Sequence, residues 1–293
     1  MAVSAYVWLI GGTSESATLA RALTDLGVPY VVTVTTSAAK QLYPSSTNVW
    51  VGQLSTHSID TFIQRWQIRC ILDASHPFAS EISRLAIAAT NQVVVSSGAI
   101  AYLRYERTEI YQQSCTDRVL SNQVSNQEDS DQRDIDTDNT DGLITFVSSL
   151  SELLDSSFLQ HQRVLFTLGC RQLSRLAPRL THLRQTSQLF VRVLPSIEAL
   201  SAAQAAGFST QEIMAIRPPV SLALERALWQ QWQISVVVAK ASGLAGGEAV
   251  KRAIALELGI RLILIERPPI LYPQQTNLIS GAIEFCVKTL RLY

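Results

Sequence analysis

Short apolar runs rich in β-branched residues alternate with longer segments of helical periodicity along the first hundred residues. This alternation is typical of a parallel sheet covered by helices on both faces. The predicted strands are Tyr6–Ile10, Tyr30–Thr35, Asn48–Val51, Cys70–Ala74 and Val93–Ser96. The predicted helices are Ser14–Leu26, Ser58–Trp66 and Pro77–Thr90. The first part of the chain therefore predicts a doubly wound α/β domain.

The pattern breaks between Gln112 and Gly142, where Ser, Asn, Gln and Asp predominate and large apolar side chains are scarce. Such a segment buries too little apolar surface to offset the entropy of ordering it, so we expect a disordered insertion. A second alternating block follows, with a last helix expected over Asn277–Leu290. Its predicted strands are Leu143–Val147, Arg163–Leu168, Phe190–Leu194, Glu212–Ile216, Ile234–Ala239 and Arg261–Ile265.

At 293 residues the chain exceeds the usual length of one domain. We predict an α/β protein of two Rossmann-like, doubly wound domains with parallel sheets and a ligand cleft between them. Residues 1–111 are expected to form the N-terminal nucleotide-binding domain, and residues 143–293 a C-terminal domain that completes the substrate cleft. Residues 112–142 are expected to form the acidic, disordered insertion.

Charge is unevenly distributed although the net charge is zero. The segment 112–142 holds eight acids and two bases, which leaves 22 bases and 16 acids in the rest of the chain. Twenty of the 24 bases are arginine, whose planar guanidinium suits carboxylates and phosphates, although codon bias explains this usage equally well. A cationic body is compatible with an anionic small molecule. Nucleic acid is not expected as a partner, because no basic run or basic-aromatic stripe is present.

No apolar stretch approaches the roughly 18–20 residues that cross a bilayer, and no basic leader precedes an apolar run. We therefore expect a cytoplasmic protein without a membrane partner. The cysteines and histidines lie too far apart in the sequence to indicate a disulfide framework or a local metal motif, so no metal site is predicted. They are Cys70, Cys115, Cys170 and Cys286, and His57, His76, His161 and His182.

A glycine-containing turn follows the first predicted strand directly. Its residues are Gly11, Gly12, Thr13, Ser14 and Glu15, followed by Ser16 and an Ala/Leu-rich helix. Glycine at such a turn lets the backbone approach a phosphate, and the helix N-terminus adds N–H groups and a positive dipole end. The turn lacks the full three-glycine fingerprint, so a phosphate cradle and a merely tight turn are both open interpretations.

The end of the second strand bears on the choice of coenzyme. Folds that prefer NAD place an acid there for the ribose 2′-hydroxyl, but this strand ends in hydroxyl residues through Thr36, with Lys40 just beyond. Hydroxyls and a cation suit a 2′-phosphate better. We therefore favour NADPH over NADH, with NADH still possible as the alternative and ordinary polar strand-end residues as the simpler interpretation.

The fourth strand ends in Asp73, which is followed by Ala74, Ser75, His76 and Pro77. In the strand order 3-2-1-4-5, the loops after strands one and four meet at the topological switch point, where such sheets bind ligands. We expect residues 11–16 and 73–79 to face the same crevice. A simpler interpretation makes His76 a helix-start residue that bonds its own turn, and Asp73 a cap.

A second glycine-rich loop follows the predicted strand Ile234–Ala239. It contains Lys240, Ser242, Gly243, Gly246 and Gly247 and leads into a helix from about Ala249. A lysine beside a helix N-terminus predicts an anion site, whereas a flexible connector is the alternative. One such loop in each half suggests a ligand held between the two.

Five segments together resemble the precorrin-6A and cobalt-precorrin-6A reductase family of cobalamin biosynthesis. They are Gly-Gly-Thr-Ser-Glu at 11–15, Asp-Ala-Ser-His-Pro-Phe-Ala at 73–79, Leu-Arg-Tyr-Glu-Arg at 103–107, Lys-Ala-Ser-Gly-Leu-Ala-Gly-Gly at 240–247 and Ile-Glu-Arg-Pro at 265–268. The resemblance implies an oxidoreductase that uses NADPH or NADH to reduce one carbon–carbon double bond of an anionic tetrapyrrole, precorrin-6A or its cobalt form, to the 6B form.

The resemblance also suggests roles for particular residues. Residues 11–15 would hold the coenzyme phosphates and ribose, with Thr36 and Lys40 near the 2′ end, while Ser75 and His76 would lie by the nicotinamide and the substrate. The remaining substrate-binding candidates are Arg104, Arg107, Lys240, Ser242 and Gly243. The chain departs from the family at Ala241, where an acid is usual, at 217–221, where Arg-Pro-Pro-Val-Ser replaces Gly-Pro-Phe-Ser, and in its acidic insertion.

Two other functions are alternatives to this one. A short-chain-type NADP-dependent oxidoreductase acting on another small substrate would carry a Tyr-x-x-x-Lys pair, and no tyrosine in this chain has a lysine four residues later. A non-catalytic dinucleotide-sensing protein would keep the fold but would not oxidise NADPH when given a tetrapyrrole.

Overall fold

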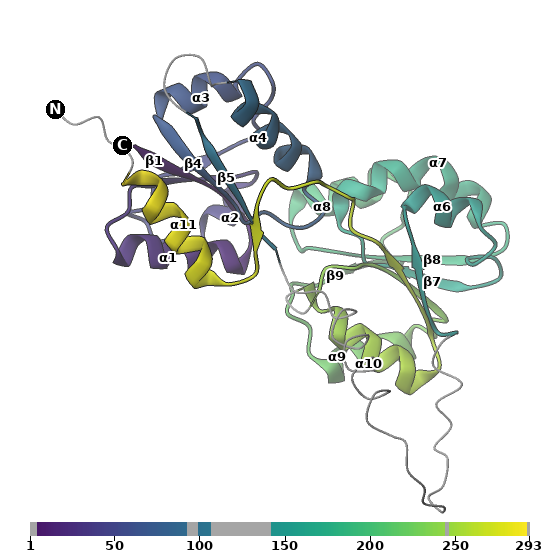
Figure 1. The fold of residues 1–293 in the computed structure, drawn as a ribbon. Coiled ribbons are helices and arrows are strands. Elements are labelled where there is room, and N and C mark those ends of the chain that lie inside the picture. The colour runs from purple at the N-terminus through teal and green to yellow at the C-terminus, as the bar shows by residue number, and fades with distance from the viewer. Residues whose placement is uncertain (1–4, 93–98, 107–141, 244–245, 292–293) are drawn as a thin grey trace, which may run out of the picture. The chain divides into compact units, whose positions relative to one another are not determined.

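The computed structural model describes residues 5–92, 99–106, 142–243 and 246–291 (Figure 1). The chain divides into two compact units, one of residues 1–108 and 268–293, the other of residues 109–267. Each unit contains a six-stranded sheet, and the strand pairs are parallel. The predicted α/β architecture with two doubly wound sheets is confirmed.

The first unit has the strand order β12-β5-β4-β1-β2-β3, which is the expected 3-2-1-4-5 order with one strand added at the edge. Its strands are β1 (Tyr6–Ile10), β2 (Tyr30–Val34), β3 (Val49–Val51), β4 (Ile68–Asp73), β5 (Ala101–Tyr105) and β12 (Gln275–Thr276). Its helices are α1 (Ser14–Asp25), α2 (Ser37–Lys40), α3 (Ile59–Arg65), α4 (Ser80–Gln92) and α11 (Ile279–Leu290). The switch point lies between β1 and β4.

Strand β1 is buried on both faces, as the continuous apolar run predicts for a central parallel strand. Val7 and Leu9 belong to the apolar cluster beneath α1 and α11, whereas Trp8 and Ile10 belong to the cluster beneath α3 and α4. This alternation follows from the two-residue period of a strand. Because both faces of β1 are covered, its carboxyl end is held firmly where the glycine turn begins.

The C-terminal segment does not belong to the domain that the sequence predicts for it. Residues 268–293 were expected in the second domain, but they join the first unit. Strand β12 pairs with β5, and α11 lies alongside α1 against the first sheet (Figure 1). Cys286 of α11 is fully buried with its Sγ 3.7 Å from that of Cys70 on β4. An apolar helix covers whichever sheet face it can reach, and sequence periodicity does not identify that face.

Two other boundaries differ from those expected. The predicted strand at residues 93–96 lies outside the described residues, and the fifth strand of the sheet is β5, which the pattern of apolar positions did not single out. The helix expected from Pro77 begins at Ser80 instead. Residues 77–79 form a turn in which the Ala79 N–H donates to the His76 carbonyl at 2.7 Å. The predicted insertion at 112–142 falls almost wholly outside the described residues.

The second unit has the strand order β6-β11-β10-β7-β8-β9. Its strands are β6 (Ile144–Val147), β7 (Arg163–Phe166), β8 (Gln188–Val193), β9 (Ile213–Ala215), β10 (Val236–Lys240) and β11 (Arg261–Ile265). Its helices are α6 (Leu150–Asp155), α7 (Leu173–Leu183), α8 (Ile197–Ala205), α9 (Leu222–Gln231) and α10 (Glu248–Leu258), with a 3₁₀ turn at Cys170–Gln172. The strand order reverses between β7 and β10, so the loops after these two strands meet at the second switch point.

Candidate functional site

The turn between β1 and α1 is organised by Thr13, the N-cap of the helix. Its side chain accepts from the Ser16 N–H at 3.1 Å, and the Ser16 hydroxyl accepts from the Thr13 N–H at 3.0 Å. This reciprocal capping box satisfies two N–H groups of the helix start. The helix itself supplies no acceptor for the N–H groups of its first two residues, Ser14 and Glu15. Gly12 adopts a left-handed φ of +96°, which favours glycine.

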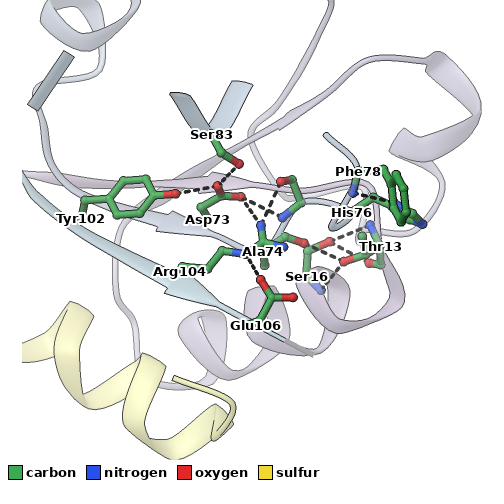
Figure 2. A network of polar contacts seen from close by, with 11 residues as sticks. Thr13, Ser16, Asp73, Ala74, His76, Phe78, Ser83, Tyr102, Arg104 and Glu106 are labelled. Atoms are coloured by element: carbon green, nitrogen blue, oxygen red, sulfur yellow. Dashed lines mark hydrogen bonds and ion pairs between the residues drawn. The ribbon is translucent and has the colours of Figure 1, made fainter. Parts of the chain in front are cut away.

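The loops after β1 and β4 meet, as the switch-point argument predicts. The Thr13 hydroxyl donates to the Ala74 carbonyl at 2.9 Å (Figure 2). The Ala74 N–H donates to the Ile10 carbonyl at 3.0 Å. The cap of α1 is therefore also the residue that joins the glycine turn to the loop of Ser75 and His76.

Asp73 is the centre of the polar network in Figure 2 and is fully buried. Its carboxylate accepts from the Ser75 N–H at 3.0 Å, Arg104 Nη1 at 2.9 Å, the Ser83 hydroxyl at 2.5 Å and the Tyr102 hydroxyl at 2.7 Å. A buried carboxylate needs such compensation, because desolvation of a charge costs several kcal/mol. Asp73 is thus more than the simple cap considered from sequence, since it also binds side chains of α4 and β5.

Arg104, expected to contact the substrate, is buried and paired inside the first unit. Its side chain is 1% exposed, and besides Asp73 it pairs with Glu106 at 2.8 Å and lies 5.3 Å from the centre of the Tyr272 ring. Burial alone lowers the pKa of the guanidinium, but the carboxylates of Asp73 and Glu106 raise it above its ordinary value. Arg104 therefore holds β5 and the Ser75 hydroxyl, 3.1 Å away, in place. Arg107 lies outside the described residues.

The network also contains side chains that sequence reasoning missed. Ser83 on α4 and Tyr102 on β5 both lie outside the motif residues, and Tyr272 comes from the C-terminal segment that joins the first unit. Tyr272 stacks on Tyr102 with ring centres 6.4 Å apart. Burial raises the pKa of Tyr102, and the charge of Asp73 raises it further, so its hydroxyl stays a donor. Only the strand order, with β4 beside β5, could have indicated this grouping.

His76 bonds its own turn, as the simpler interpretation has it. The Phe78 N–H donates to His76 Nδ1 at 3.2 Å, and the ring centres of these two residues are 5.9 Å apart. Because Nδ1 accepts, a neutral ring carries its proton on Nε2. The turn thereby fixes both the tautomer and the direction of the ring.

The end of β2 presents Thr36 and Lys40 at the surface. Thr36 is the N-cap of α2 and accepts from the Ala39 N–H at 3.3 Å, and Lys40 is the last residue of that short helix. Thr33 is buried instead, where its hydroxyl accepts from the Trp8 indole at 2.8 Å. The sequence from residue 33 to residue 40 contains no acid, so this strand end presents hydroxyls and one cation.

Lys240 lies at the second switch point, at the end of β10. Burial and, to a smaller extent, the neighbouring cations Arg171 and Arg175 together lower the pKa of its amine to about 8. Both arginines follow β7, the sheet neighbour of β10. The sequence motifs did not single them out, because it is the strand order of the folded sheet that places β7 beside β10. The positive charges of Arg171 and Arg175 therefore act on the amine of Lys240.

The first turn of α10 supports the loop after Lys240. The Gly243 N–H donates to Glu248 Oε2 at 2.8 Å, while Arg252 Nε donates to Glu248 Oε1 at 2.8 Å. A Cβ at Gly246 would come within 1.9 Å of the Ser242 hydroxyl, so glycine is required there for close packing. Gly243 has a φ of +73°. The loop is thus a packed structure at these residues, which counts against a loose connector.

Ala241 marks one of the departures from the family pattern. Its carbonyl accepts from Arg267 Nε at 2.9 Å, and its N–H donates to the Ile265 carbonyl at 2.8 Å.

Within the described ranges, no cluster of three or more His, Cys, Asp or Glu side chains could ligate a metal ion. No helix in the same ranges has the length and apolar character needed to span a bilayer.

Comparison with known proteins agrees with the motifs. Residues 6–287 match the family model described as precorrin-6x reductase CbiJ/CobK. The chain is 39% identical to the cobalt-precorrin-6A reductase of Synechocystis sp. over 98% of this chain and 97% of the relative. It is 31% identical to the cobalt-precorrin-6A reductase of Priestia megaterium over 91% of this chain and 92% of the relative. A solved structure of a CobK precorrin-6A reductase matches with a TM-score of 0.70 at 20% identity, covering 98% of both chains, which supports the fold.

The match extends through both units, so the motifs at residues 11–15, 73–79 and 240–247 all fall within it. These reductases are oxidoreductases that act on a CH–CH bond of a tetrapyrrole in cobalamin biosynthesis, as the resemblance implied. The chain belongs to the precorrin-6x reductase family.

Proposed function

We propose that this reductase uses NADPH, and that the turn between β1 and α1 holds the coenzyme phosphates. The observation that carries the proposal is the hydrogen bond from Thr13 to Ala74, because it joins a glycine turn at a helix N-terminus to the Ser75–His76 loop. A Cβ added at Gly12 would meet no atom within 4 Å, so there is room for a ligand on the outer side of the turn. The exposed Ser14 hydroxyl, which donates to Glu15 Oε2 at 3.0 Å, lies at the same turn. We propose that the positive end of the α1 dipole and the first turn of this helix attract the pyrophosphate.

The preference for NADPH rests on the end of β2. Thr36 and Lys40 are exposed, and residues 33–40 include no acid that could accept from a ribose 2′-hydroxyl. A 2′-phosphate would find a hydroxyl and a cation there. The coenzyme supplies a hydride when bound, and the protein positions the two planar ligands and excludes water.

Ser75 and His76 are proposed to lie beside the nicotinamide and the substrate. Asp73 fixes the Ser75 backbone, Arg104 fixes its hydroxyl, and the turn at Phe78 orients the imidazole. Both side chains are therefore supported by hydrogen bonds before any ligand binds. Such support lowers the cost of holding a reactive geometry.

The second unit is proposed to bind the substrate's carboxylates. The proposed site keeps the residues predicted from sequence, Lys240, Ser242 and Gly243. It also includes Arg171 and Arg175, because their charges lower the pKa of the Lys240 amine. The substrate we propose is cobalt-precorrin-6A, the compound named in the relatives from Synechocystis and Priestia. Acetate and propionate groups on such a ring are anions that guanidinium and ammonium groups attract.

An anaerobic assay with both substrates and both coenzymes tests these proposals. We expect the reduced-nicotinamide absorbance to fall fastest with cobalt-precorrin-6A and NADPH. Faster oxidation of NADH would overturn the coenzyme assignment, and faster turnover of metal-free precorrin-6A would overturn the substrate assignment.

His76→Ala and Lys240→Ala should each lower turnover or substrate affinity, while exposed His57→Ala serves as the matched control. Full activity in both variants would refute the proposed site.

A further inference from the structure

Tyr43 places its hydroxyl inside the glycine turn, although it lies beyond α2 in the chain. Its oxygen accepts from the Gly12 N–H at 2.8 Å and is 2.6 Å from the Ser16 hydroxyl. The side chain is 7% exposed and packs in the apolar cluster beneath α1. No sequence motif singled out this tyrosine.

The hydrogen bonds around the Ser16 hydroxyl determine where the Tyr43 proton lies. Ser16 Oγ donates to the Thr13 carbonyl at 2.7 Å and accepts from the Thr13 N–H, so its one proton is used. Tyr43 must then donate to Ser16 and accept from Gly12. Burial raises the pKa of Tyr43 above its ordinary value although the bonds to Ser16 and Gly12 lower it, so the phenol stays protonated.

Gly11 is required because of this tyrosine. A Cβ at Gly11 would lie 2.3 Å from the Tyr43 oxygen and 2.7 Å from a methyl carbon of Val32. The first glycine of the turn therefore makes room for a protein hydroxyl, whereas the expectation from sequence was room for a phosphate. Gly12 is required for a different reason, because its left-handed φ of +96° favours glycine.

Tyr43 is also hydrogen-bonded to the segment that follows β2. Its N–H donates to the Lys40 carbonyl at 3.1 Å, directly after the helix that Thr36 caps. We propose that Tyr43 is a positioning residue of the coenzyme site, fastening residues 36–43 to the glycine turn and so fixing the spacing between 2′-phosphate and pyrophosphate contacts. This inference rests on the proposed use of NADPH at that turn.

The spacing matters because both phosphate groups belong to one molecule of limited flexibility. If residues 36–40 shift relative to the turn, a ligand cannot use both sets of contacts at full strength. NADH lacks the 2′-phosphate and depends on the turn alone. Loss of the Tyr43 hydroxyl should therefore weaken NADPH binding more than NADH binding.

Tyr43→Phe tests this, because it removes one hydroxyl and keeps the ring. We expect the KM and the Kd for NADPH to rise about fivefold, as the loss of roughly one net hydrogen bond implies, with the NADH values and kcat changed by less than about twofold. Tyr30→Phe is the matched control. Tyr30 lies in the same cluster, and its hydroxyl is 2.7 Å from that of Thr24, away from the turn.

A general loss of packing would lower the unfolding temperature of both variants without changing the NADPH-to-NADH ratio. An unchanged ratio in Tyr43→Phe, or an equal change in Tyr30→Phe, would overturn the inference. Wild-type protein that binds neither coenzyme in a fluorescence titration would overturn the proposed function and this inference with it. Wild-type preference for NADPH that Tyr43→Phe retains would overturn this inference alone.

Discussion

The guanidinium of Arg104 lies 2.9 Å from the carboxylate of Asp73, and their side chains are 1% and 0% exposed. Arg104 is on β5 and Asp73 ends β4, so the pair joins two neighbouring strands just where the Ser75–His76 loop begins. The pair is part of the framework of the site, and its removal should affect folding before it affects chemistry.

Arg104→Ala should destabilise the protein by about 3–5 kcal/mol, because it leaves the Asp73 charge buried without its partner. Denaturant unfolding followed by circular dichroism measures the change. Lys288→Ala removes an exposed ion pair with Glu284 and should leave the midpoint unaltered. Equal stability of the two variants would show that Asp73 is not held as a charged group.

Gly11→Ala should destabilise the protein by about 1–3 kcal/mol, since the new methyl group would overlap the Tyr43 hydroxyl and Val32. Gly142→Ala is the control, because a Cβ there would meet no atom within 4 Å. Thermal unfolding of the two variants provides the comparison. A Gly11→Ala protein as stable as Gly142→Ala would mean that Tyr43 does not occupy the turn.

Substrate affinity should depend on pH through Lys240, whose amine has a pKa of about 8. The protonated amine attracts carboxylates, so the substrate KM should be low below this pH and should rise as pH increases through it. Initial rates at several substrate concentrations between about pH 6.5 and 9.5 measure the profile around this pKa. Lys240→Arg stays charged throughout and should remove the rise. A wild-type KM that is constant over this range would contradict the assignment.

Glu248→Ala should release the Gly243 N–H and the Arg252 guanidinium together. We expect a stability loss of about 2–3 kcal/mol and a higher substrate KM, because the loop that follows Lys240 loses its support. Glu257→Ala provides a matched control, since Glu257 is 44% exposed and contacts Arg226 on the surface. If the KM changes equally in both variants, Glu248 does not support the loop.

Much of the first unit could be predicted from local patterns. The glycine turn, the loop after Asp73 and their meeting at the switch point all follow from strand order and from the rule that parallel strands end at one edge. The Thr13–Ala74 bond agrees with that prediction. Arg104 was expected to contact the substrate because it lies in the segment 103–107 that resembles the family, and only its neighbours Asp73 and Glu106 reveal that it is buried and paired.

The sequence by itself determined the two α/β sheets, the places where chemistry-bearing loops interrupt them, and the family, because these depend on periodicity and on short motifs. Only the tertiary structure decided which sheet α11 covers, that Tyr43 fills the turn at Gly11, and that Arg171 and Arg175 join Lys240. Each of these relationships joins residues far apart in the chain. Local periodicity carries no information about such pairs, because they depend on which strands become neighbours and which apolar faces meet.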